Sequence, residues 1–396
     1  MAEHVSFVVP MQEAAGADQV TITGDPNDEV DVLIVGARVA GSILAILLGR
    51  AGRRVLVVDR ATFPSATIST HYFRGEWCVS ALESVGVLPE VLATGAPPLV
   101  REYNADALDG SWSVDPPQSP GSIGYCLSVR RETLDAILVE RARRESTVTI
   151  EERTAMHELV MEEGRVVGAT ISTDTGDRSV RARVVVGADG HASRVARQVG
   201  AKTQELIPAS RAMYYRYMHG MQGPQGAPDG PEFSAGDDDL AYVFPSDEGF
   251  ACVAVSYNLA DYANARTRAE EAFQERIGEH PFIAERAAAA TPMGRLWACG
   301  PRDAIVRHPV GQGWALVGDA SMQQDPWTGN GMDFASTHAC YLAESIEDLL
   351  SGRSTEAAAW SSYHRRRDEH GLPGWRETGE LGKDLNAAFR PAANPG

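Results

Sequence analysis

The feature that most constrains this chain is a glycine-containing turn between a strand-like segment and a helix-like segment. Val30–Val35 is apolar except at Asp31, and its run Val32–Val35 is of the kind found in strands that are buried on both faces. Residues Gly36–Gly41 follow with the sequence Gly-Ala-Arg-Val-Ala-Gly, and a helical pattern then continues to Arg50. The first glycine permits a tight turn, and the last permits close packing of the helix on the strand. The free N–H groups at such a helix N-terminus suit a pyrophosphate.

An acidic residue stands where this type of turn needs one. Asp59 follows Gly41 by 18 residues and closes a second strand-like segment, Arg54–Asp59. An acid at this separation can accept hydrogen bonds from ribose hydroxyl groups. We therefore predict a dinucleotide-binding unit rather than a purely structural βαβ unit. Arg38 replaces the middle glycine of the usual pattern, so its bulk could hinder the backbone's approach or its guanidinium could pair with a phosphate, and we favour the pairing.

Two further carboxylates come directly after apolar, strand-like runs. Asp189 and Asp319 each follow such a run, which places both at the carboxyl edge of a predicted parallel sheet. Ligands of open α/β folds bind at this edge. The turn Gly329–Gly331 opens a long helical pattern that continues to Leu350, and its backbone N–H groups suit a group with negative character.

Three motifs follow one another along the chain: the Gly36–Gly41 turn, the strand end with Asp189, and the segment from Asp319 to Met332. In this order, they resemble those of the FAD-dependent, aromatic-hydroxylase-like monooxygenases, the single-chain (group A) flavoproteins. The similarity covers most of residues 30–350. It implies an α/β fold, in which a glutathione-reductase-like FAD-binding domain carries an inserted, mainly antiparallel-sheet substrate domain and C-terminal helices. It also implies FAD as the cofactor and NAD(P)H as the electron donor.

The resemblance gives the conspicuous residues expected roles. The Gly36–Gly41 turn would surround the pyrophosphate, and Asp59 would hold the adenosine ribose. Arg131 would contact the ribityl or phosphate region, and Asp319 would bind the ribityl chain. Asp189 belongs to an Asp-Gly motif that the family uses for both FAD and the nicotinamide donor.

Other expected roles concern the flavin ring. The turn Gly329–Met332 would lie against the pyrimidine edge, near N1 and O2. His71 lies at the position where the chain of the family passes the flavin ring. It is expected to be a proton carrier or hydrogen-bond donor there, and the alternative is an ordinary loop histidine. Tyr215 and Arg216 are further catalytic candidates, although as strand neighbours they face opposite sides, and the sequence does not say which side lines the pocket. The predicted cofactor-binding residues are Gly36, Ala37, Arg38, Val39, Ala40, Gly41, Asp59, Arg60, Arg131, Met156, Asp189, Asp319, Gly329, Asn330, Gly331 and Met332.

Two departures from the family pattern bear on the reaction. Met322 replaces the usual histidine, and Asp325-Pro326 is more like the geranylgeranyl-reductase and flavin-halogenase branch. The halogenases of this resemblance need an active-site lysine in the first third of the chain and a Trp-x-Trp-x-Ile-Pro segment. Here no lysine precedes Lys202, and no Trp-x-Trp occurs, which argues against halogenation.

We therefore expect an FAD-dependent monooxygenase that hydroxylates or epoxidises an electron-rich, aromatic or polyketide-like small molecule through a C4a-hydroperoxyflavin. A flavin-dependent reductase or dehydrogenase of unsaturated bonds, and a non-redox flavoprotein scaffold or cyclase, are the alternatives. The sequence has no second Rossmann fingerprint for NAD(P)H. A separate flavin reductase is therefore an alternative source of electrons.

The composition of the chain limits the classes of partner and the cellular compartment that we expect. The net charge of −18, from 54 acidic and 36 basic residues, argues against nucleic-acid or membrane partners, which need a basic surface. The five cysteines show neither Cys-x-x-Cys pairs nor zinc-ligand spacing, so we expect a reducing compartment and no metal. The N-terminus lacks the layout of a signal peptide, and we expect a cytoplasmic protein.

The chain divides by composition and pattern. Residues 95–121 are rich in proline and glycine and are expected to form loops or a small excursion, and the segment from Gly371 is expected to be an irregular tail. The expected organisation is a mobile arm at 1–29, a discontinuous FAD-binding domain at 30–204 and 300–352, a substrate domain at 205–299, and a C-terminal helix and tail at 353–396.

Overall fold

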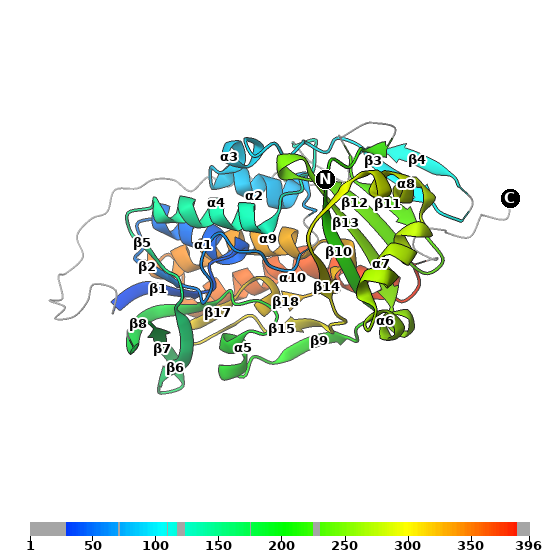
Figure 1. Ribbon diagram of the computed structural model, residues 1–396. Helices are drawn as coiled ribbons and strands as arrows, with labels where there is room; N and C mark the ends of the chain where they lie inside the picture. The colour runs from blue at the N-terminus through cyan, green and yellow to red at the C-terminus, as the bar shows by residue number, and fades with distance from the viewer. Residues whose placement is uncertain are drawn as a thin grey trace.

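The structure is a computed structural model, and it describes residues 29–69, 72–108, 110–116, 123–174, 176–224 and 230–385. Two large sheets lie side by side, with helices packed against each of them (Figure 1). The first sheet is mainly parallel at its centre, and the second is mainly antiparallel. This is the expected α/β fold class. The expected arm at 1–29 lies outside the described residues, apart from Glu29.

The first sheet has the strand order β16-β17-β8-β1-β2-β5, and β7 and β6 continue from β8 as an antiparallel meander. The pairs β1–β2, β1–β8, β2–β5 and β8–β17 are parallel. Strands at the centre of such a sheet are covered on both faces, which explains the apolar run Val32–Val35 in β1. The strands are β1 (Glu29–Val35), β2 (Val55–Val58), β5 (Val148–Glu151), β6 (Ala155–Glu162), β7 (Arg165–Thr173), β8 (Gly176–Gly187), β16 (Val310–Gly311) and β17 (Trp314–Leu316).

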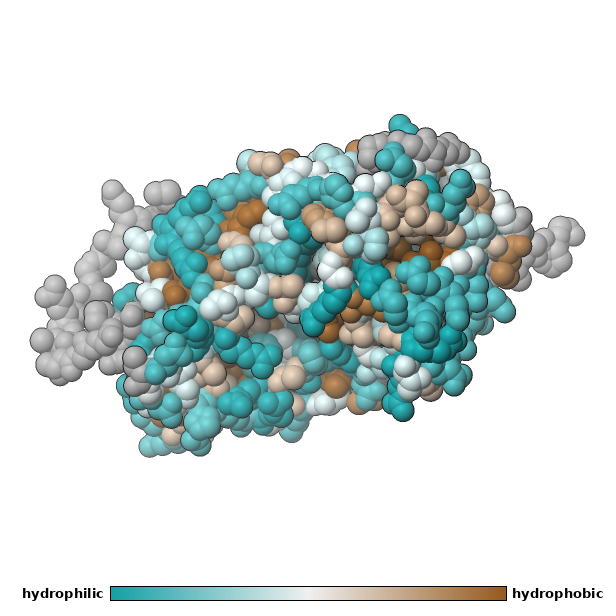
Figure 2. Space-filling view, viewed as in Figure 1, coloured by the Kyte–Doolittle hydropathy of each residue, from teal (hydrophilic) through white to brown (hydrophobic). Residues whose placement is uncertain are grey.

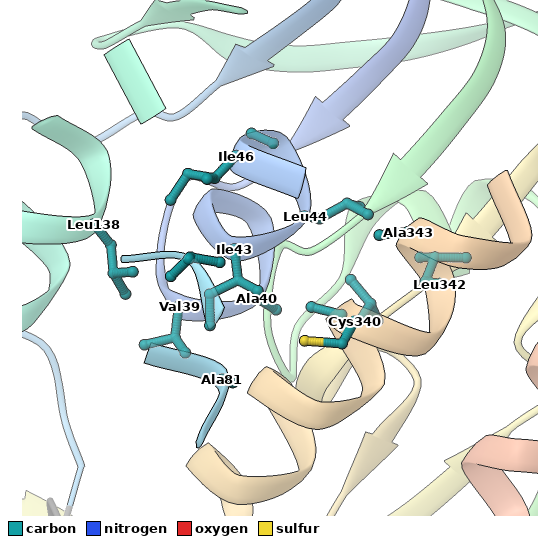
Figure 3. Packing of buried hydrophobic residues seen from close by; sticks show 14 of the residues in the cluster. Val39, Ala40, Ile43, Leu44, Ile46, Ala81, Leu138, Cys340, Leu342 and Ala343 are labelled. Carbon is teal, nitrogen blue, oxygen red and sulfur yellow. The ribbon is translucent and has the colours of Figure 1, made fainter. Parts of the chain in front are cut away.

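Three helices cover one face of this sheet: α1 (Val39–Arg50), α4 (Arg131–Arg143) and α9 (Gly331–Leu350). Nearly every residue of α1 is buried because the sheet, α4 and α9 enclose it. Figure 3 shows Ile43 of α1 near Leu138 of α4, with residues of α9 on the other side of α1. The opposite face of the sheet packs against the β6–β7 meander and the short helix α5.

The second sheet has the order β14-β10-β13-β12-β11-β3-β4, and of its pairs only β11–β3 is parallel. Its outer face is covered by α6, α7 and α8, whereas its inner face carries an aromatic cluster that packs against Tyr72 and Trp327. The elements of this half are β3 (Glu102–Asp106), β4 (Trp112–Asp115), β10 (Arg211–His219), β11 (Glu232–Ala235), β12 (Leu240–Pro245), β13 (Phe250–Asn258), β14 (Thr291–Cys299), α6 (Leu259–Ala265), α7 (Ala269–Gly278) and α8 (Pro281–Ala289).

A small antiparallel sheet, β18-β15-β9, and the long helix α10 join the two halves. The Trp375 indole of α10 donates a hydrogen bond of 2.7 Å to the backbone carbonyl of Gln323 in β18. These and the remaining elements are β9 (Thr203–Ile207), β15 (Ala304–Arg307), β18 (Met322–Gln323), α2 (Ser80–Ser84), α3 (Leu88–Leu92), α5 (Arg194–Gln198), α10 (Glu356–Leu381) and the helical turns η1 (Gly75–Val79), η3 (Asp247–Gly249), η4 (Gly318–Ala320) and η5 (Pro326–Thr328).

Two expectations about chain organisation need correction. The proline- and glycine-rich stretch 95–121 supplies β3 and β4, so the second sheet draws strands from outside the expected 205–299 segment. The expected tail from Gly371 is helical as far as Leu381, because α10 continues through Pro373 and its buried face packs on the small sheet. In both places tertiary pairing overrides local breaker residues.

One face of the molecule is mainly hydrophilic. Hydrophilic residues predominate on the face shown in Figure 2, and apolar residues show there in scattered groups. Among the residues that the structure describes, no helix combines the length and apolar character that crossing a bilayer requires.

Two histidines are enclosed between α9 and α10. His338 Nε2 lies 3.2 Å from His370 Nδ1, and the His338 side chain is fully buried. Burial lowers the pKa of His370 to about 4. Burial, with the neighbouring His370 and Arg367, also holds the pKa of His338 well below its usual value. The fold therefore contains two imidazoles that stay neutral at mildly acidic pH.

We expect the free energy of unfolding to fall as the pH drops from 6.5 toward 4. Above this window His370 and His338 are neutral in both the folded and the unfolded chain. Within it the unfolded chain takes up protons that the folded chain does not, which favours unfolding. His370→Gln should remove about 2 kcal/mol of the loss between about pH 7.5 and about pH 5. Urea unfolding at both pH values measures this, with the exposed His157→Gln as control. The same pH dependence in His370→Gln and wild type would contradict it.

Candidate active site

A cleft of about 610 Å³ lies between the carboxyl edge of the first sheet and the inner face of the second. The ends of β1, β2 and β8, together with the turns that precede α1 and α9, form one side of it. Tyr215 of β10 and Cys299 of β14 line it from the second sheet. Motifs that are far apart in the sequence therefore meet at one site.

The Gly36–Gly41 turn has the geometry that the sequence predicts. Gly36 has a φ of +107°, and an added Cβ would lie 2.4 Å from the backbone oxygen of Ala188 at the end of β8. At Gly41 an added Cβ would lie 1.8 Å from the Gly36 oxygen. A side chain at Gly36 would force the ends of β1 and β8 apart, and one at Gly41 would force α1 away from β1, so both glycines are required for this close approach.

Asp59 holds the same turn from the end of β2. Its Oδ2 accepts a hydrogen bond of 2.8 Å from the backbone N–H of Ala37, and its Oδ1 accepts one of 2.8 Å from that of Ala61. Each carboxylate oxygen has a second lone pair, and Asp59 lines the cleft. The predicted contact with a ribose is compatible with this structural use of the carboxylate.

Arg38 and Arg131 share one buried carboxylate, that of Asp135 in α4. Arg38 Nη1 lies 2.5 Å from Asp135 Oδ2, and it also donates to the Ser65 carbonyl at 3.2 Å. Arg131 donates to both oxygens of Asp135, each at 3.0 Å. Both arginines line the cleft. The guanidinium of Arg38 thus has a protein partner already, and the predicted phosphate contact would be made by a group that Asp135 orients.

The two other predicted carboxylates differ in their surroundings. Asp189 Oδ2 accepts hydrogen bonds from the backbone N–H groups of Arg194, at 2.6 Å, and Val195, at 3.3 Å, whereas Oδ1 is buried without a partner in the described structure. Burial raises the pKa of Asp319, an effect that Arg131 and Arg302 oppose. Both carboxylates line the cleft and are available to a polar ligand.

The turn before α9 is fixed from outside the cleft. Asn330 Oδ1 accepts a hydrogen bond from Arg74 Nη1, and Arg74 also donates to both oxygens of the buried Asp333 at 3.0 Å. Asn330 is therefore occupied with Arg74, whereas Gly329, Gly331 and Met332 line the cleft. The predicted cofactor-binding residues that the structure brings together around the cleft are Gly36, Arg38, Val39, Ala40, Asp59, Arg60, Arg131, Met156, Asp189, Asp319, Gly329, Gly331 and Met332.

The three catalytic candidates have different outcomes. Tyr215 lines the cleft, and its hydroxyl donates to the Thr67 carbonyl at 3.4 Å. Arg216 is wrong as a cleft residue, because it lies on the opposite face of β10 and pairs with Glu270 of α7 through two contacts of 2.6 Å. His71 lies outside the described residues, so its role stays a prediction.

Several lining residues were missed by sequence reasoning, notably Gln324, Cys299, His191 and Arg302. His191 and Gln324 lie inside predicted motifs, two residues after Asp189 and five after Asp319, which was a usable signal. Cys299 and Arg302 come from the end of β14 and the loop after it, which only tertiary folding brings to the cleft. Asp135 was also missed, although its position four residues after Arg131 was a usable signal for an ion pair on one helix face.

These residues fit an FAD molecule. The closely packed glycine turn leaves backbone N–H groups at the N-terminus of α1, and Arg38 and Arg131 supply positive charge beside them. The unpartnered Asp189 Oδ1 and the Asp319 carboxylate are acceptors suited to hydroxyl groups. Pyrophosphate, ribose and ribityl chain each have a chemically matching partner in the cleft.

Comparison with known proteins agrees with this fit. Residues 29–372 match a family described as an FAD binding domain. The class that fold and site define is an FAD-dependent oxidoreductase. More particularly, the chain belongs to the FAD-binding-domain family of the aromatic-hydroxylase-like flavoprotein monooxygenases.

Individual relatives have different names. Digeranylgeranylglycerophospholipid reductase 2 of Methanopyrus kandleri is 30% identical over 376 residues, which covers 91% of this chain and 85% of that protein. The crystal structure of PqsL, a probable FAD-dependent monooxygenase from Pseudomonas aeruginosa, has a TM-score of 0.75 at 25% identity and covers 92% of this chain and 97% of that one. The myxobacterial chondrochloren halogenase CndH, with a TM-score of 0.78 at 22% identity, covers 91% and 82% and shows the shared fold.

We expect Asp135→Asn to cost more stability than Arg38→Met. Removing the buried carboxylate leaves two arginines without their shared partner, at a cost of about 2–3 kcal/mol. Removing Arg38 leaves Asp135 paired with Arg131, so the cost should stay at about 1 kcal/mol. Urea unfolding of the flavin-free protein measures both, with Arg144→Met as control, because Arg144 pairs with Glu90 at the surface. Equal losses for the two site variants would mean that Asp135 does not hold both arginines.

Proposed function

We propose that this protein is an FAD-dependent monooxygenase that hydroxylates or epoxidises a small, electron-rich, aromatic or polyketide-like molecule with electrons from NAD(P)H. The observation that carries the proposal is the meeting of two surfaces in one cleft. Asp319, Gly329 and Met332 approach from the cofactor side, while Tyr215 and Cys299 approach from the second sheet. A substrate between these surfaces would lie directly against the flavin.

The substrate side of the cleft is lined by the flat ring of Tyr215, which stacks on Trp297. The rings of Tyr215 and Trp297 are nearly parallel, with an interplanar angle of 4° and centroids 5.9 Å apart. Deeper in the inner face, Phe244 stacks on Tyr72 and Tyr242, with centroid distances of 5.1 Å and 5.0 Å. Such surfaces favour unsaturated, planar ligands.

The aromatic cluster that contains Tyr215 is itself closed to water, which suits the proposed oxygen transfer. Tyr72, Tyr242 and Phe244 are each no more than 3% exposed, and they belong to the same apolar cluster as the cleft residue Tyr215. When bound, the flavin supplies the redox chemistry. The protein's contribution is to bind and orient the substrate and to exclude water from the reacting atoms.

Tyr215 lines the substrate side of the cleft and holds the segment before His71 in place. Burial raises the pKa of its hydroxyl above the usual value, so the group remains protonated at neutral pH. It donates to the Thr67 carbonyl and accepts from the Ser69 N–H at 3.3 Å, which ties the segment before His71 to β10. We therefore propose no proton abstraction by Tyr215.

The names of the relatives support two candidate functions. PqsL, named as a probable monooxygenase, has also been crystallised with 2-aminobenzoylacetate, a small substituted aromatic acid. The Methanopyrus relative is named a reductase, and Asp325-Pro326 of this chain points the same way. Reduction of an unsaturated bond is therefore the second candidate function. A separate flavin reductase would be an alternative to direct reduction by NAD(P)H in either case.

The decisive test is the origin of oxygen in the product. FAD-loaded protein, NADPH and a panel of phenolic and polyketide-type compounds are screened with an oxygen electrode, and the active compound is then converted under isotopically labelled O2. We expect one labelled atom per product molecule, and slow NADPH oxidation with peroxide release when substrate is omitted. Arg216→Met is the matched control, because it lies on the covered face of β10.

Label entering from water, or no label, would contradict monooxygenation. Turnover of the compound under anaerobic conditions with reduced protein would establish the reductase function in its place.

A further inference from the structure

Gln324 has a buried side chain whose amide forms no hydrogen bond within the described structure. Gln324 lies between β18 and the turn before α9, lines the cleft, and is 8% exposed. Both its Oε1 and its Nε2 are buried, and neither has a hydrogen-bond partner in the described structure. A buried amide without partners destabilises a fold, so its retention needs an explanation.

Its neighbours show that this is particular to Gln324. Gln323 Nε2 donates to the Asp303 carbonyl at 3.1 Å. Asp325 Oδ2 accepts from the Ser210 hydroxyl at 3.1 Å, and Oδ1 accepts from the Trp327 N–H at 3.4 Å. The side chains on both sides of Gln324 are thus engaged with the fold, whereas its own amide is available to a ligand in the cleft.

We infer that Gln324 is a substrate-binding, specificity-determining residue for a neutral ligand that presents an N–H donor beside a C=O acceptor, such as a lactam or a cyclic imide. A primary carboxamide offers one acceptor and one donor side by side, which complements that edge. A carboxylate ligand would satisfy the Nε2 group and leave Oε1 unpaired. The inference rests on the proposed function, since it names the class of substrate for the same site.

The wall of the cleft from the second sheet carries neutral groups, while the charged side chains near it, Arg302 and Asp319, are of opposite sign. On the substrate side of the cleft, Tyr215 has a hydroxyl that stays protonated, and burial likewise raises the pKa of the Cys299 thiol to about 11. Met332 and the backbone of Gly329 add no charge. An amide in such surroundings discriminates strongly, because a ligand lacking the matching edge would leave Oε1 and Nε2 unpaired in the complex as well.

The first arm of the test measures stability without ligand. Gln324→Leu replaces the unpartnered amide with an apolar group of similar size, so the melting temperature of flavin-free protein should rise by about 2 °C. Gln323→Leu, the matched control, removes an amide that is bonded to Asp303, so its melting temperature should fall. A lower melting temperature for Gln324→Leu would show that the fold uses this amide, and the inference would be overturned.

The second arm measures recognition in FAD-loaded protein. The probes are isoquinolin-1(2H)-one, a bicyclic lactam, and 1-naphthol, which has a similar shape without the N–H and C=O pair. Titration is followed by the change in flavin absorbance. Wild type should bind the lactam about tenfold more tightly than the naphthol, and Gln324→Leu should bind both alike. No preference for the lactam in wild type, or an unchanged preference in Gln324→Leu, would overturn the ligand class.

The flavin itself presents an imide edge, and a third arm separates this source from the substrate. Gln324→Leu should retain FAD with an affinity within about twofold of wild type, because the amide is assigned to the substrate. At least tenfold weaker FAD binding would assign Gln324 to the cofactor and overturn the inference. A failure of the labelled-oxygen experiment would leave all three arms unchanged, so the two proposals fail separately.

Discussion

The structure depends on the close approach of three backbone segments at Gly36, where β1 ends between its neighbours β2 and β8. The Gly36 N–H donates to the Val58 carbonyl at 2.8 Å, and the Ala188 N–H donates to the Val35 carbonyl at 2.8 Å. An added Cβ at Gly36 would lie 2.4 Å from the Ala188 oxygen. Three strands therefore end together at the carboxyl edge of the first sheet, and no side chain at Gly36 separates their backbones. Helix α1 begins at this edge, and the cleft lies beside its N-terminus.

A second constraint is the way in which charge is arranged around the cleft. Asp135 orients Arg38 and Arg131 toward it, and the backbone N–H groups beside Asp189 fix one of that carboxylate's oxygens while leaving the other without a partner. The second sheet contributes neutral aromatic surface in place of charge. The cleft thus has a polar half that suits a dinucleotide and an apolar half that suits an organic substrate.

How far the sequence predicts this structure depends on the range of the interactions involved. The Gly36 turn, its acid and the two strand-end carboxylates could be predicted because short-range rules of turn geometry and sheet edges govern them. Arg216 could not be assigned to a face, since both faces of β10 are largely buried and neither gives a polar pattern. The strand β3 was missed because it forms by pairing with β11, more than a hundred residues away, and β4 was missed because it forms by pairing with β3. Gln324 was missed because its lack of partners exists only in three dimensions.

The central claim is that this cleft binds one FAD through the Gly36 turn. Titration of flavin-free protein with FAD, followed by fluorescence quenching and by ultrafiltration, tests it most directly. The account predicts one non-covalent FAD per chain and loss of binding in Gly36→Ala, because the added methyl group meets the Ala188 oxygen at a positive φ. Absence of flavin binding by the wild-type protein, or undiminished binding by a folded Gly36→Ala variant, would contradict it.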